Sequence, residues 1–463
     1  MLDAFLISQI TAELPFAPNE EQKKTIGLLA AFLLSQSDKP CFLLRGYAGT
    51  GKTSLMAALV RVLKKVESAN ASADKENYVL LAPTGRAAKV LGHYAGHNAF
   101  TIHKCIYRGG TLLPGNDSRT PFALQENKRT HTLFIVDEAG MISRNLLDDL
   151  MCYVYQGAGC KLLLLGDDAQ LPPVEMSASY ALDPTYLAGY GVDLSSACLT
   201  EVARQALDSG ILSNATRLRD YLTQGFPTPV LTPAEDMQLL APQAMVEAIE
   251  DSYRTVGEEE TLIITRSNYR TNLYNQGIRA RILYREEDIT TGDRIMVCRN
   301  NYYQSRDYDD LPFIANGDMF TVIRLRNERE MYGFRFADAT LQSVDYGHEI
   351  DALLWLDTLT TATPDDHYTM QRTLFERIAE DYPELTRQRD KIERIKESPY
   401  FNALQIRFAY AVTCHKAQGG QWRHVFIDPE RIPTDGTATN EDTRWLYTAL
   451  TRATEKAMVN FKK

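Results

Sequence analysis

The chain has 463 residues, of which 44% are hydrophobic and 24% are charged. This balance is ordinary for a globular protein, and at about 150 residues per domain the length predicts roughly three domains. Fifty Lys and Arg residues against sixty Asp and Glu residues give a net charge of -10, which excludes a histone-like protein that holds nucleic acid through bulk charge. An acidic chain can still carry local basic stripes, so a nucleic-acid enzyme is not excluded.

The cysteines and the apolar segments indicate where the protein works. The seven cysteines are scattered and form no C-x-x-C pair, which predicts reduced thiols rather than a metal site. No apolar run reaches the roughly 18 residues of a membrane span, and the N-terminal segment lacks the basic start of a signal peptide. We therefore expect a cytoplasmic protein without a membrane partner.

The first half of the chain predicts alternating helices and buried strands. Residues 2–36 predict two amphipathic helices, with Asn19 as the N-cap of the second. Short apolar runs that end at small or acidic residues follow, and they alternate with helical segments. These runs lie at 41–46, 78–83, 132–138 and 161–167. The pattern predicts a parallel sheet that is buried on both faces.

The second half predicts another α/β core with an interruption. It starts near residue 200, and strands are expected at 261–266 and 424–428. Residues 320–402 begin as alternating β-sequence and continue as a charged helical stretch at 375–397, which implies an insertion. In the first half, the turn-rich segment 105–131 predicts a projecting hairpin. The expected fold class is α/β, with domains at 1–195, 196–319 plus 403–463, and 320–402.

A complete G-x-x-x-x-G-K-[ST] loop runs from Gly46 to Thr53, between a predicted strand and a predicted helix, as this motif requires. Its glycines let backbone N–H groups curl around phosphate oxygens at a helix N-terminus. Lys52 can reach the β and γ phosphates, and the Thr53 hydroxyl can bind Mg²⁺. The expected nucleotide-binding residues are Gly46, Ala48, Gly49, Thr50, Gly51, Lys52, Thr53 and Ser54.

Acidic and amide side chains follow two later strands. Asp137 and Glu138 end the run at 132–138, where α/β sheets bind ligands. Asp137 is expected to hold Mg²⁺ and Glu138 to orient or deprotonate the attacking water. Gln170 follows the next strand, and its amide can accept from a water and donate to the γ-phosphate. An ordinary acidic turn would explain these residues too, but the upstream phosphate loop favours a catalytic site.

Arg204 and Arg452 lie far along the chain, in or beside the second core. Phosphoryl transfer requires a cation on the developing charge of the γ-phosphate, and arginine usually supplies it. An arginine on an amphipathic helix is more often a surface residue, so spacing alone does not decide between the two interpretations.

Other polar residues at strand ends are suited to nucleic acid. Hydroxyl, imidazole and ammonium donors can contact phosphates and sugars without reading sequence, and nearby aromatic rings can stack on bases. Within the hairpin, Phe122 and Tyr107 are the candidates to wedge against the first base pair, and the sequence does not decide between them. Taken singly, each of these residues is more often a surface or core residue. The expected contacts are Thr84, Arg86, Lys89, Thr101, His103, Thr413, His415, Lys416 and Phe122.

Eleven ordered segments carry a family resemblance. They are NEEQKK, GYAGTGKTS, LAPTGRAAKVL, TIHK, FIVDEAGMIS, LLLLGDDAQLPPV, LTEVARQ, GDRIMVCRNNY, NGD, AVTCHKAQGGQWRHVFI and LYTALTRA. Together they resemble superfamily 1 helicases of the 5′→3′ branch (superfamily 1B), which includes RecD and Dda. The QLPPV ending resembles RecD and differs from the 3′→5′ branch typified by UvrD. DEAGM departs slightly from the common DEASM form.

The resemblance implies two RecA-like cores with ATP between them. It assigns adenine recognition to Gln22, and coupling of the nucleotide state to the DNA track to Gly420 and Gln421. Segment 105–131 corresponds to a strand-separating pin, and 320–402 corresponds to an SH3-like insertion. The implied catalytic residues are Lys52, Glu138, Gln170, Arg204 and Arg452, the last two reaching over from the second core.

The expected function is therefore an ATP- and Mg²⁺-dependent DNA helicase that moves 5′→3′ on single-stranded DNA and unwinds tailed duplex DNA. We expect a monomer that can meet replication or repair proteins. A motor for RNA or RNA–DNA hybrids is an open alternative, because strand-end contacts do not reveal the sugar preference. A nucleotide-dependent switch or loader is another, and it predicts an ATPase that does not respond to single strands.

Overall fold

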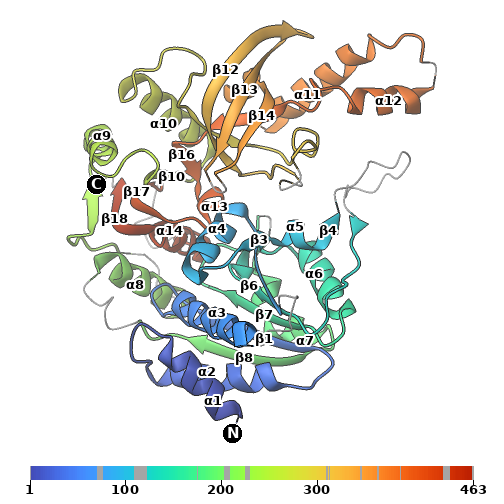
Figure 1. The fold of residues 1–463 in the computed structure, drawn as a ribbon. Coiled ribbons are helices and arrows are strands. Elements are labelled where there is room, and N and C mark those ends of the chain that lie inside the picture. The colour runs from blue at the N-terminus through green and yellow to red at the C-terminus, as the bar shows by residue number, and fades with distance from the viewer. Residues whose placement is uncertain are drawn as a thin grey trace. The chain divides into compact units, whose positions relative to one another are not determined.

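The computed structural model describes residues 2–69, 77–108, 123–174, 176–202, 209–224, 230–308, 311, 313–344, 347–361, 364–385, 387–430 and 438–460. The chain forms two compact units (Figure 1). The first unit comprises Met1–Tyr107, Leu124–Leu240 and Ala417–Lys463, and the second comprises Arg108–Ala123 and Ala241–Lys416. The three domain boundaries expected from the sequence stay a prediction. Within the described ranges, no helix combines the length and the apolar character needed to cross a bilayer.

A six-stranded parallel sheet forms the centre of the first unit, with the order β3-β2-β6-β7-β1-β8. Its strands are β1 (Pro40–Gly46), β2 (Tyr78–Ala82), β3 (Ala99–Thr101), β6 (Leu133–Val136), β7 (Lys161–Gly166) and β8 (Asp193–Leu199). The four strands expected in this part of the sequence are confirmed. They read as continuous apolar runs because both faces of the sheet are covered.

Helices cover each face of this sheet. Phe42 and Leu44 of β1 pack with residues of α1 (Leu2–Ala12), α2 (Glu20–Leu34), α3 (Lys52–Ala69) and α4 (Gly85–Ala95). Cys41 and Leu43 point to the other face, which packs with α5 (Ile102–Ile106), α6 (Arg144–Gln156) and α7 (Pro184–Ala188). The 3₁₀ turns η1 (Ala139–Met141) and η2 (Tyr180–Leu182) lie between these elements.

The start of α2 shows how local sequence fixes a helix end. The Asn19 side chain accepts a hydrogen bond from the Gln22 N–H at 2.8 Å, and the Gln22 Oε1 atom accepts one from the Asn19 N–H at 3.0 Å. This reciprocal capping box satisfies two backbone donors that the helix itself leaves unpaired. The expected helix pair and its N-cap are confirmed.

Two further groups of parallel strands follow, one in each unit. The first unit holds β17 (Trp422–Asp428), β18 (Ala453–Asn460) and β9 (Met237–Leu240) in that order, with α8 (Gly210–Gln224) and α14 (Asn440–Leu450). The second unit holds the parallel pair β10 (Thr261–Thr265) and β16 (Ala411–Thr413). Its helices here are α9 (Met245–Thr255), α10 (Asn268–Arg281) and α13 (Cys414–Ala417), with the 3₁₀ turn η4 (Pro242–Ala244).

A closed five-stranded barrel completes the second unit (Figure 1). Its strands are β11 (Arg294–Val297), β12 (Met319–Met331), β13 (Phe334–Ser343), β14 (Glu349–Trp355) and β15 (Leu404–Phe408). The 3₁₀ turn η5 (Leu356–Leu359) directly follows β14. The charged stretch at 375–397 contains the end of α11 (Pro364–Ala379) and all of α12 (Gln388–Lys396). Leu374, Ile378 and Ile395 of these helices are buried with Phe336 and Trp355 of the barrel. The stretch is therefore an amphipathic cover for the barrel.

These elements confirm the expected fold class of two parallel-sheet cores with a β-rich insertion. In the first core, β4 (Tyr107–Arg108) and β5 (Ala123–Leu124) pair as a short two-stranded sheet at the base of the expected hairpin. Residues 109–122 of that hairpin, including Phe122, lie outside the described residues.

Candidate nucleotide site and strand-end segments

The phosphate loop has the strand–loop–helix context that its motif requires. Strand β1 ends at Gly46, and α3 begins at Lys52. Gly49 and Gly51 have φ angles of 75° and 89°, in the left-handed region that favours glycine. The Lys52 ammonium donates to the carbonyl oxygens of Gly46 and Tyr47, the latter at 3.1 Å. The loop and the head of Lys52 therefore lie together at the N-terminus of α3, as a phosphate site needs.

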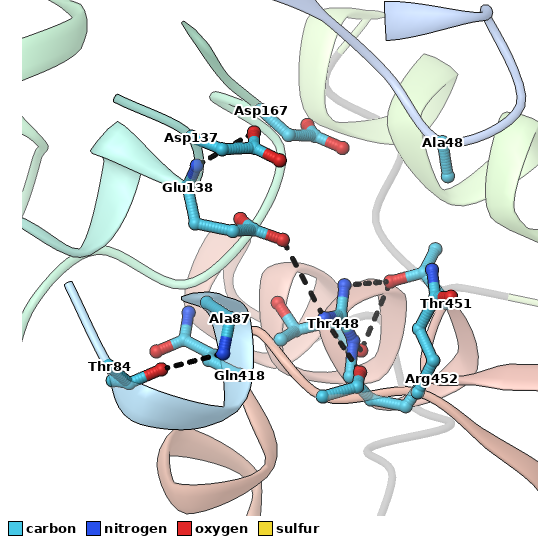
Figure 2. Close-up of polar contacts among 12 residues, drawn as sticks. Ala48, Thr84, Ala87, Asp137, Glu138, Asp167, Gln418, Thr448, Thr451 and Arg452 are labelled. Carbon is cyan, nitrogen blue, oxygen red and sulfur yellow. Dashed lines mark hydrogen bonds and ion pairs between the residues drawn. The ribbon is translucent and has the colours of Figure 1, made fainter. Parts of the chain in front are cut away.

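Three carboxylates lie at the adjoining edge of the sheet. Asp137 and Glu138 follow β6, and Asp167 follows its neighbour β7 (Figure 2). Burial, together with the charge of Glu138, raises the pKa of Asp137 to about 6, while the Lys52 charge acts in the opposite direction. Burial also raises the pKa of Asp167, again against the effect of Lys52. The three acids and Lys52 thus form one electrostatic cluster.

The Glu138 backbone is held in an unusual conformation. Its φ angle is 49°, a left-handed value that costs of order 1 kcal/mol or more for a residue other than glycine. Its N–H donates to the Asp137 Oδ1 atom at 2.8 Å. Such strain persists where the surrounding structure fixes it, and it is common at functional sites.

Arg452 faces Glu138 from the C-terminal part of the first unit (Figure 2). Its Nη1 atom lies 3.8 Å from Glu138 Oε1, and the Arg452 side chain is only 5% exposed. The guanidinium also donates to the carbonyl oxygens of Thr448 and Gly420, at 3.1 and 3.2 Å. These bonds fix the cation beside the carboxylate. The catalytic role of Arg452 stays a prediction.

Gln170 lies in a loop after β7 that α14 and the residues before β17 hold in place. Leu171 donates its N–H to the Thr448 hydroxyl at 2.8 Å and accepts from the Gln418 amide at 2.8 Å. Arg444 donates to the carbonyl oxygen of Gln170 at 3.1 Å. The Oε1 atom of Gln170 is buried, and within the described part of the chain it accepts no hydrogen bond. A buried acceptor without a protein partner suits a residue expected to hold a water.

Two functional candidates were missed by the sequence reasoning. Asp167 follows an apolar strand just as Asp137 does, so the same strand-end rule could have found it. The Tyr447 hydroxyl donates to Asp167 Oδ2 at 2.6 Å and accepts from the Ala48 N–H at 2.9 Å. Because residues 48 and 447 are 399 positions apart, no spacing in the sequence indicates this contact.

Gln22 has structural partners that the sequence did not predict. Its side chain is 3% exposed, and its Nε2 atom donates to the Thr50 carbonyl of the phosphate loop at 3.0 Å. A Cβ atom at Gly51 would lie only 2.7 Å from this nitrogen, so the loop approaches Gln22 closely. The amide keeps one further N–H and one further lone pair. Adenine recognition by Gln22 stays a prediction beside its role as a support of the loop.

The donor set fits Mg²⁺. Mg²⁺ prefers oxygen ligands and is usually held by one or two protein groups together with phosphate oxygens. Thr53 in the first turn of α3 supplies a hydroxyl, and Asp137 supplies a carboxylate. Across the described ranges, no group of three or more His, Cys, Asp or Glu side chains forms a separate metal cluster.

The strand-end threonines of the first unit act as helix caps. The Thr84 hydroxyl accepts from the Ala87 N–H at 3.2 Å at the start of α4 (Figure 2), and the Thr101 hydroxyl accepts from the Lys104 N–H at the start of α5. Capping explains these two threonines without nucleic acid. Their contacts with DNA stay a prediction.

The remaining strand-end residues have varied surroundings. The Arg86 guanidinium lies 4.8 Å from the centre of the Trp422 ring, and Lys89 is exposed on α4. Burial lowers the pKa of His103, whose ring lies against Tyr107. In the second unit, Thr413 ends β16, and His415 and Lys416 lie in α13. Burial lowers the pKa of Lys416, which donates to Asn316.

Gly420 and Gln421, which are expected to couple the nucleotide state to the DNA track, contact Arg452 and α4 of the first unit. The Gly420 carbonyl accepts from Arg452, and the Gln421 carbonyl accepts from Arg86 at 3.3 Å. Gly419 has a φ angle of 74°, and a Cβ atom there would lie 2.7 Å from Ala87 Cβ. The absence of a side chain at Gly419 therefore lets this segment approach the start of α4 closely. Arg204, the other expected arginine, lies outside the described residues.

Two family models match the chain. The AAA domain matches residues 18–228, and the UvrD-like helicase C-terminal domain matches residues 408–459. These ranges contain the phosphate loop, the carboxylates and the segment that carries Arg452.

Several proteins are similar to the whole chain or to part of it. An uncharacterized protein, R530 of Acanthamoeba polyphaga mimivirus, is 22% identical over 95% of this chain and 98% of its own. The ATP-dependent DNA helicase dda of Enterobacteria phage T4 is 23% identical over 83% of this chain and 86% of its own. The ATP-dependent RecD2 DNA helicase of Deinococcus radiodurans is 30% identical over 42% of this chain and 23% of its own.

Among solved structures, Bacteroides Pif1 bound to ssDNA aligns over 96% of this chain and 92% of its own, with 17% identity and a TM-score of 0.49. By its family models and its sequence relatives, the chain is similar to superfamily 1B helicases of the RecD and Dda type.

Proposed function

We propose that the protein is an ATP-dependent DNA helicase that moves 5′→3′ along single-stranded DNA and unwinds duplex DNA. The observation that carries the proposal is the cluster at the phosphate loop, where Lys52, three carboxylates and the buried Arg452 converge. Buried charges of both signs at the carboxyl edge of a parallel sheet are typical of a phosphoryl-transfer site. The proposed direction follows from the superfamily 1B branch.

Each residue of the cluster has a proposed task in hydrolysis. Lys52 neutralises the β and γ phosphates, and Arg452 neutralises charge that develops on the γ-phosphate. Glu138 orients or deprotonates the attacking water, and the buried Oε1 atom of Gln170 accepts a hydrogen bond from that water. Thr53 and Asp137 hold Mg²⁺, which when bound supplies further positive charge to the phosphates.

The proposed nucleic-acid contacts include Arg86, Lys89 and His103 of the first unit and His415 and Lys416 of the second. Arginine, lysine and histidine at strand ends can hold the sugar–phosphate backbone without reading the bases. A motor also requires the affinity for DNA to differ between nucleotide states, because otherwise hydrolysis produces no directional work. Gly419 and Gly420 support such coupling. Gly419 lies against the start of α4, and the Gly420 carbonyl accepts a hydrogen bond from Arg452.

The decisive experiment uses one duplex that carries either a 5′ or a 3′ single-stranded tail. With ATP and Mg²⁺, we expect the protein to open the 5′-tailed duplex and to leave the 3′-tailed duplex closed. Opening of the 3′-tailed duplex alone would overturn the direction. If neither duplex opened and single strands left the ATPase unchanged, a nucleotide-dependent switch would be the better interpretation. Matched RNA and RNA–DNA substrates test the alternative motor.

The Lys52→Ala variant tests the assignment of the site. Without the ammonium group, ATP turnover is expected to fall by at least about 10²-fold, because a preorganised charge on the transition state is lost. Binding of a fluorescent single-stranded oligonucleotide is expected to change little, since Lys52 lies at the phosphate loop. Retained ATP-driven unwinding in this variant would remove Lys52 from the mechanism.

A measurement of the molar mass of the protein in solution, with and without DNA, tests the expected monomer.

A further inference from the structure

Tyr447 connects the phosphate loop to the carboxylate cluster, and neither motif predicts that contact. The residue lies on α14 and is 1% exposed. Its hydroxyl accepts from the Ala48 N–H at 2.9 Å and donates to Asp167 Oδ2 at 2.6 Å. A phenol has one hydrogen to donate, so the direction of this short chain is fixed from Ala48 through Tyr447 to Asp167.

The Ala48 N–H is one of the backbone donors of the phosphate loop. A backbone N–H has one hydrogen, and here that hydrogen is given to a neutral phenol oxygen. A phosphate oxygen is a charged acceptor, and hydrogen bonds to charged acceptors are roughly twice as strong as neutral ones. A nucleotide phosphate at this donor would therefore compete with Tyr447.

The same helix contacts the loop that carries Gln170. Thr448, the next residue, accepts from the Leu171 N–H, and Arg444 donates to the Gln170 carbonyl. Thr448 also accepts from Arg452 through its carbonyl oxygen. A change at Tyr447 therefore acts on the helix whose residues position both Gln170 and the Arg452 guanidinium.

We propose that the Tyr447 hydroxyl is a positioning group that competes with the phosphates of ATP for the Ala48 N–H. Through this competition, occupation of the phosphate loop changes the packing of α14 and hence the placement of Gln170 and Arg452. The inference rests on the proposed ATP site and deepens it. Tyr447 acts through other groups and performs no chemistry itself.

The Tyr447→Phe variant removes the hydroxyl and keeps the ring that fills the buried space. Loss of the competitor is expected to tighten binding of a non-hydrolysable ATP analogue about three- to tenfold, the range of one intramolecular hydrogen bond. The KM for ATP is expected to fall by a similar factor. AMP has no β or γ phosphate, so its binding is expected to stay unchanged. Calorimetric titration of both nucleotides measures these effects.

Two further variants separate competition from a general loosening of the fold. Tyr253→Phe removes another buried hydroxyl, on α9, which has no hydrogen-bond partner in the described part of the chain, and it is expected to leave nucleotide binding unchanged. Thr448→Val removes the acceptor of the Leu171 N–H while keeping the shape of the side chain. Loosening of α14 alone would give Thr448→Val and Tyr447→Phe the same phenotype, and competition would tighten binding only in Tyr447→Phe.

Equal or weaker binding of the ATP analogue by a folded Tyr447→Phe variant would overturn the inference, as would equal tightening in Thr448→Val. Thermal unfolding of each variant checks that it is folded. The tailed-duplex assay on the wild-type protein tests the proposed function separately. A wild-type protein that unwinds DNA, with no change in nucleotide binding by Tyr447→Phe, would leave the helicase function intact and remove only the role of Tyr447.

Discussion

The nucleotide site and the strand-end segments APTGRAAK and TIHK lie at the carboxyl ends of strands in one parallel sheet, yet they use polar groups differently. In the nucleotide site, burial disfavours the charged forms of Asp137 and Asp167. At the strand ends, Thr84 and Thr101 satisfy the N–H groups of the next helix. Burying charge against its own solvation indicates function, whereas a helix cap is explained by stability alone. The structure therefore supports a functional assignment more strongly for the nucleotide site than for the strand-end segments.

The largest expected effect tests the nucleotide side of this comparison. Glu138→Gln keeps the size of the side chain and removes the base that is expected to act on water. We expect ATP turnover to fall about 10²- to 10³-fold, the usual contribution of a general base, with ATP still bound. Steady-state ATPase assays and nucleotide titration measure the two effects.

A matched control for that variant is Glu126→Gln, which changes an exposed glutamate outside the cluster. It is expected to leave turnover unchanged. If Glu138→Gln kept more than a tenth of the wild-type rate, the strained Glu138 backbone would need another explanation. The claim that buried charge at the nucleotide site indicates function would then be wrong.

The next effect tests the segment that links the two regions. Gly419→Ala places a Cβ atom 2.7 Å from Ala87 Cβ at a φ angle of 74°. Overpacking and the left-handed backbone together are expected to lower the free energy of unfolding by about 2–4 kcal/mol. Urea unfolding followed by circular dichroism measures this loss.

Gly277→Ala is the control for the glycine substitution. Gly277 lies within α10, and a Cβ atom there meets nothing within 4 Å. Alanine is a better helix former, so this variant is expected to gain about 0.5–1 kcal/mol. If Gly419→Ala were as stable as the wild type, the close approach of the Gly419 segment to α4 would not require glycine at this position.

Much of the fold could be predicted from the sequence because it follows from local patterns. Continuous apolar runs predicted β1, β2, β6 and β7, and Asn19 predicted the start of α2. The phosphate loop was readable because its glycines, lysine and threonine are contiguous. These features depend on a few neighbouring residues, so one sequence is enough to find them.

The rest of the site depends on contacts between distant segments. Tyr447 reaches Ala48 across 399 positions, and Thr448 reaches Leu171 across 277. The sequence placed Arg452 in a motif but could not show that Gly420 and Thr448 fix its guanidinium. It also could not show that Thr84 and Thr101 cap helices, because their hydroxyl groups suit either role. Side-chain partners of this kind are set by packing, which periodicity does not reveal.

The smallest expected effect decides how to interpret those threonines. Thr84→Val removes the cap of α4 at nearly constant shape and is expected to cost about 1 kcal/mol of unfolding free energy, while Thr84→Ser should restore most of it. Thr84→Asn keeps a capping oxygen but replaces the hydroxyl that a phosphate would contact. If Thr84 is only a cap, stability and single-strand affinity in Thr84→Asn both stay near those of the wild type. If the hydroxyl also contacts DNA, Thr84→Asn remains stable but binds single strands more weakly. The strand-end segments would then have a functional assignment as well supported as that of the nucleotide site.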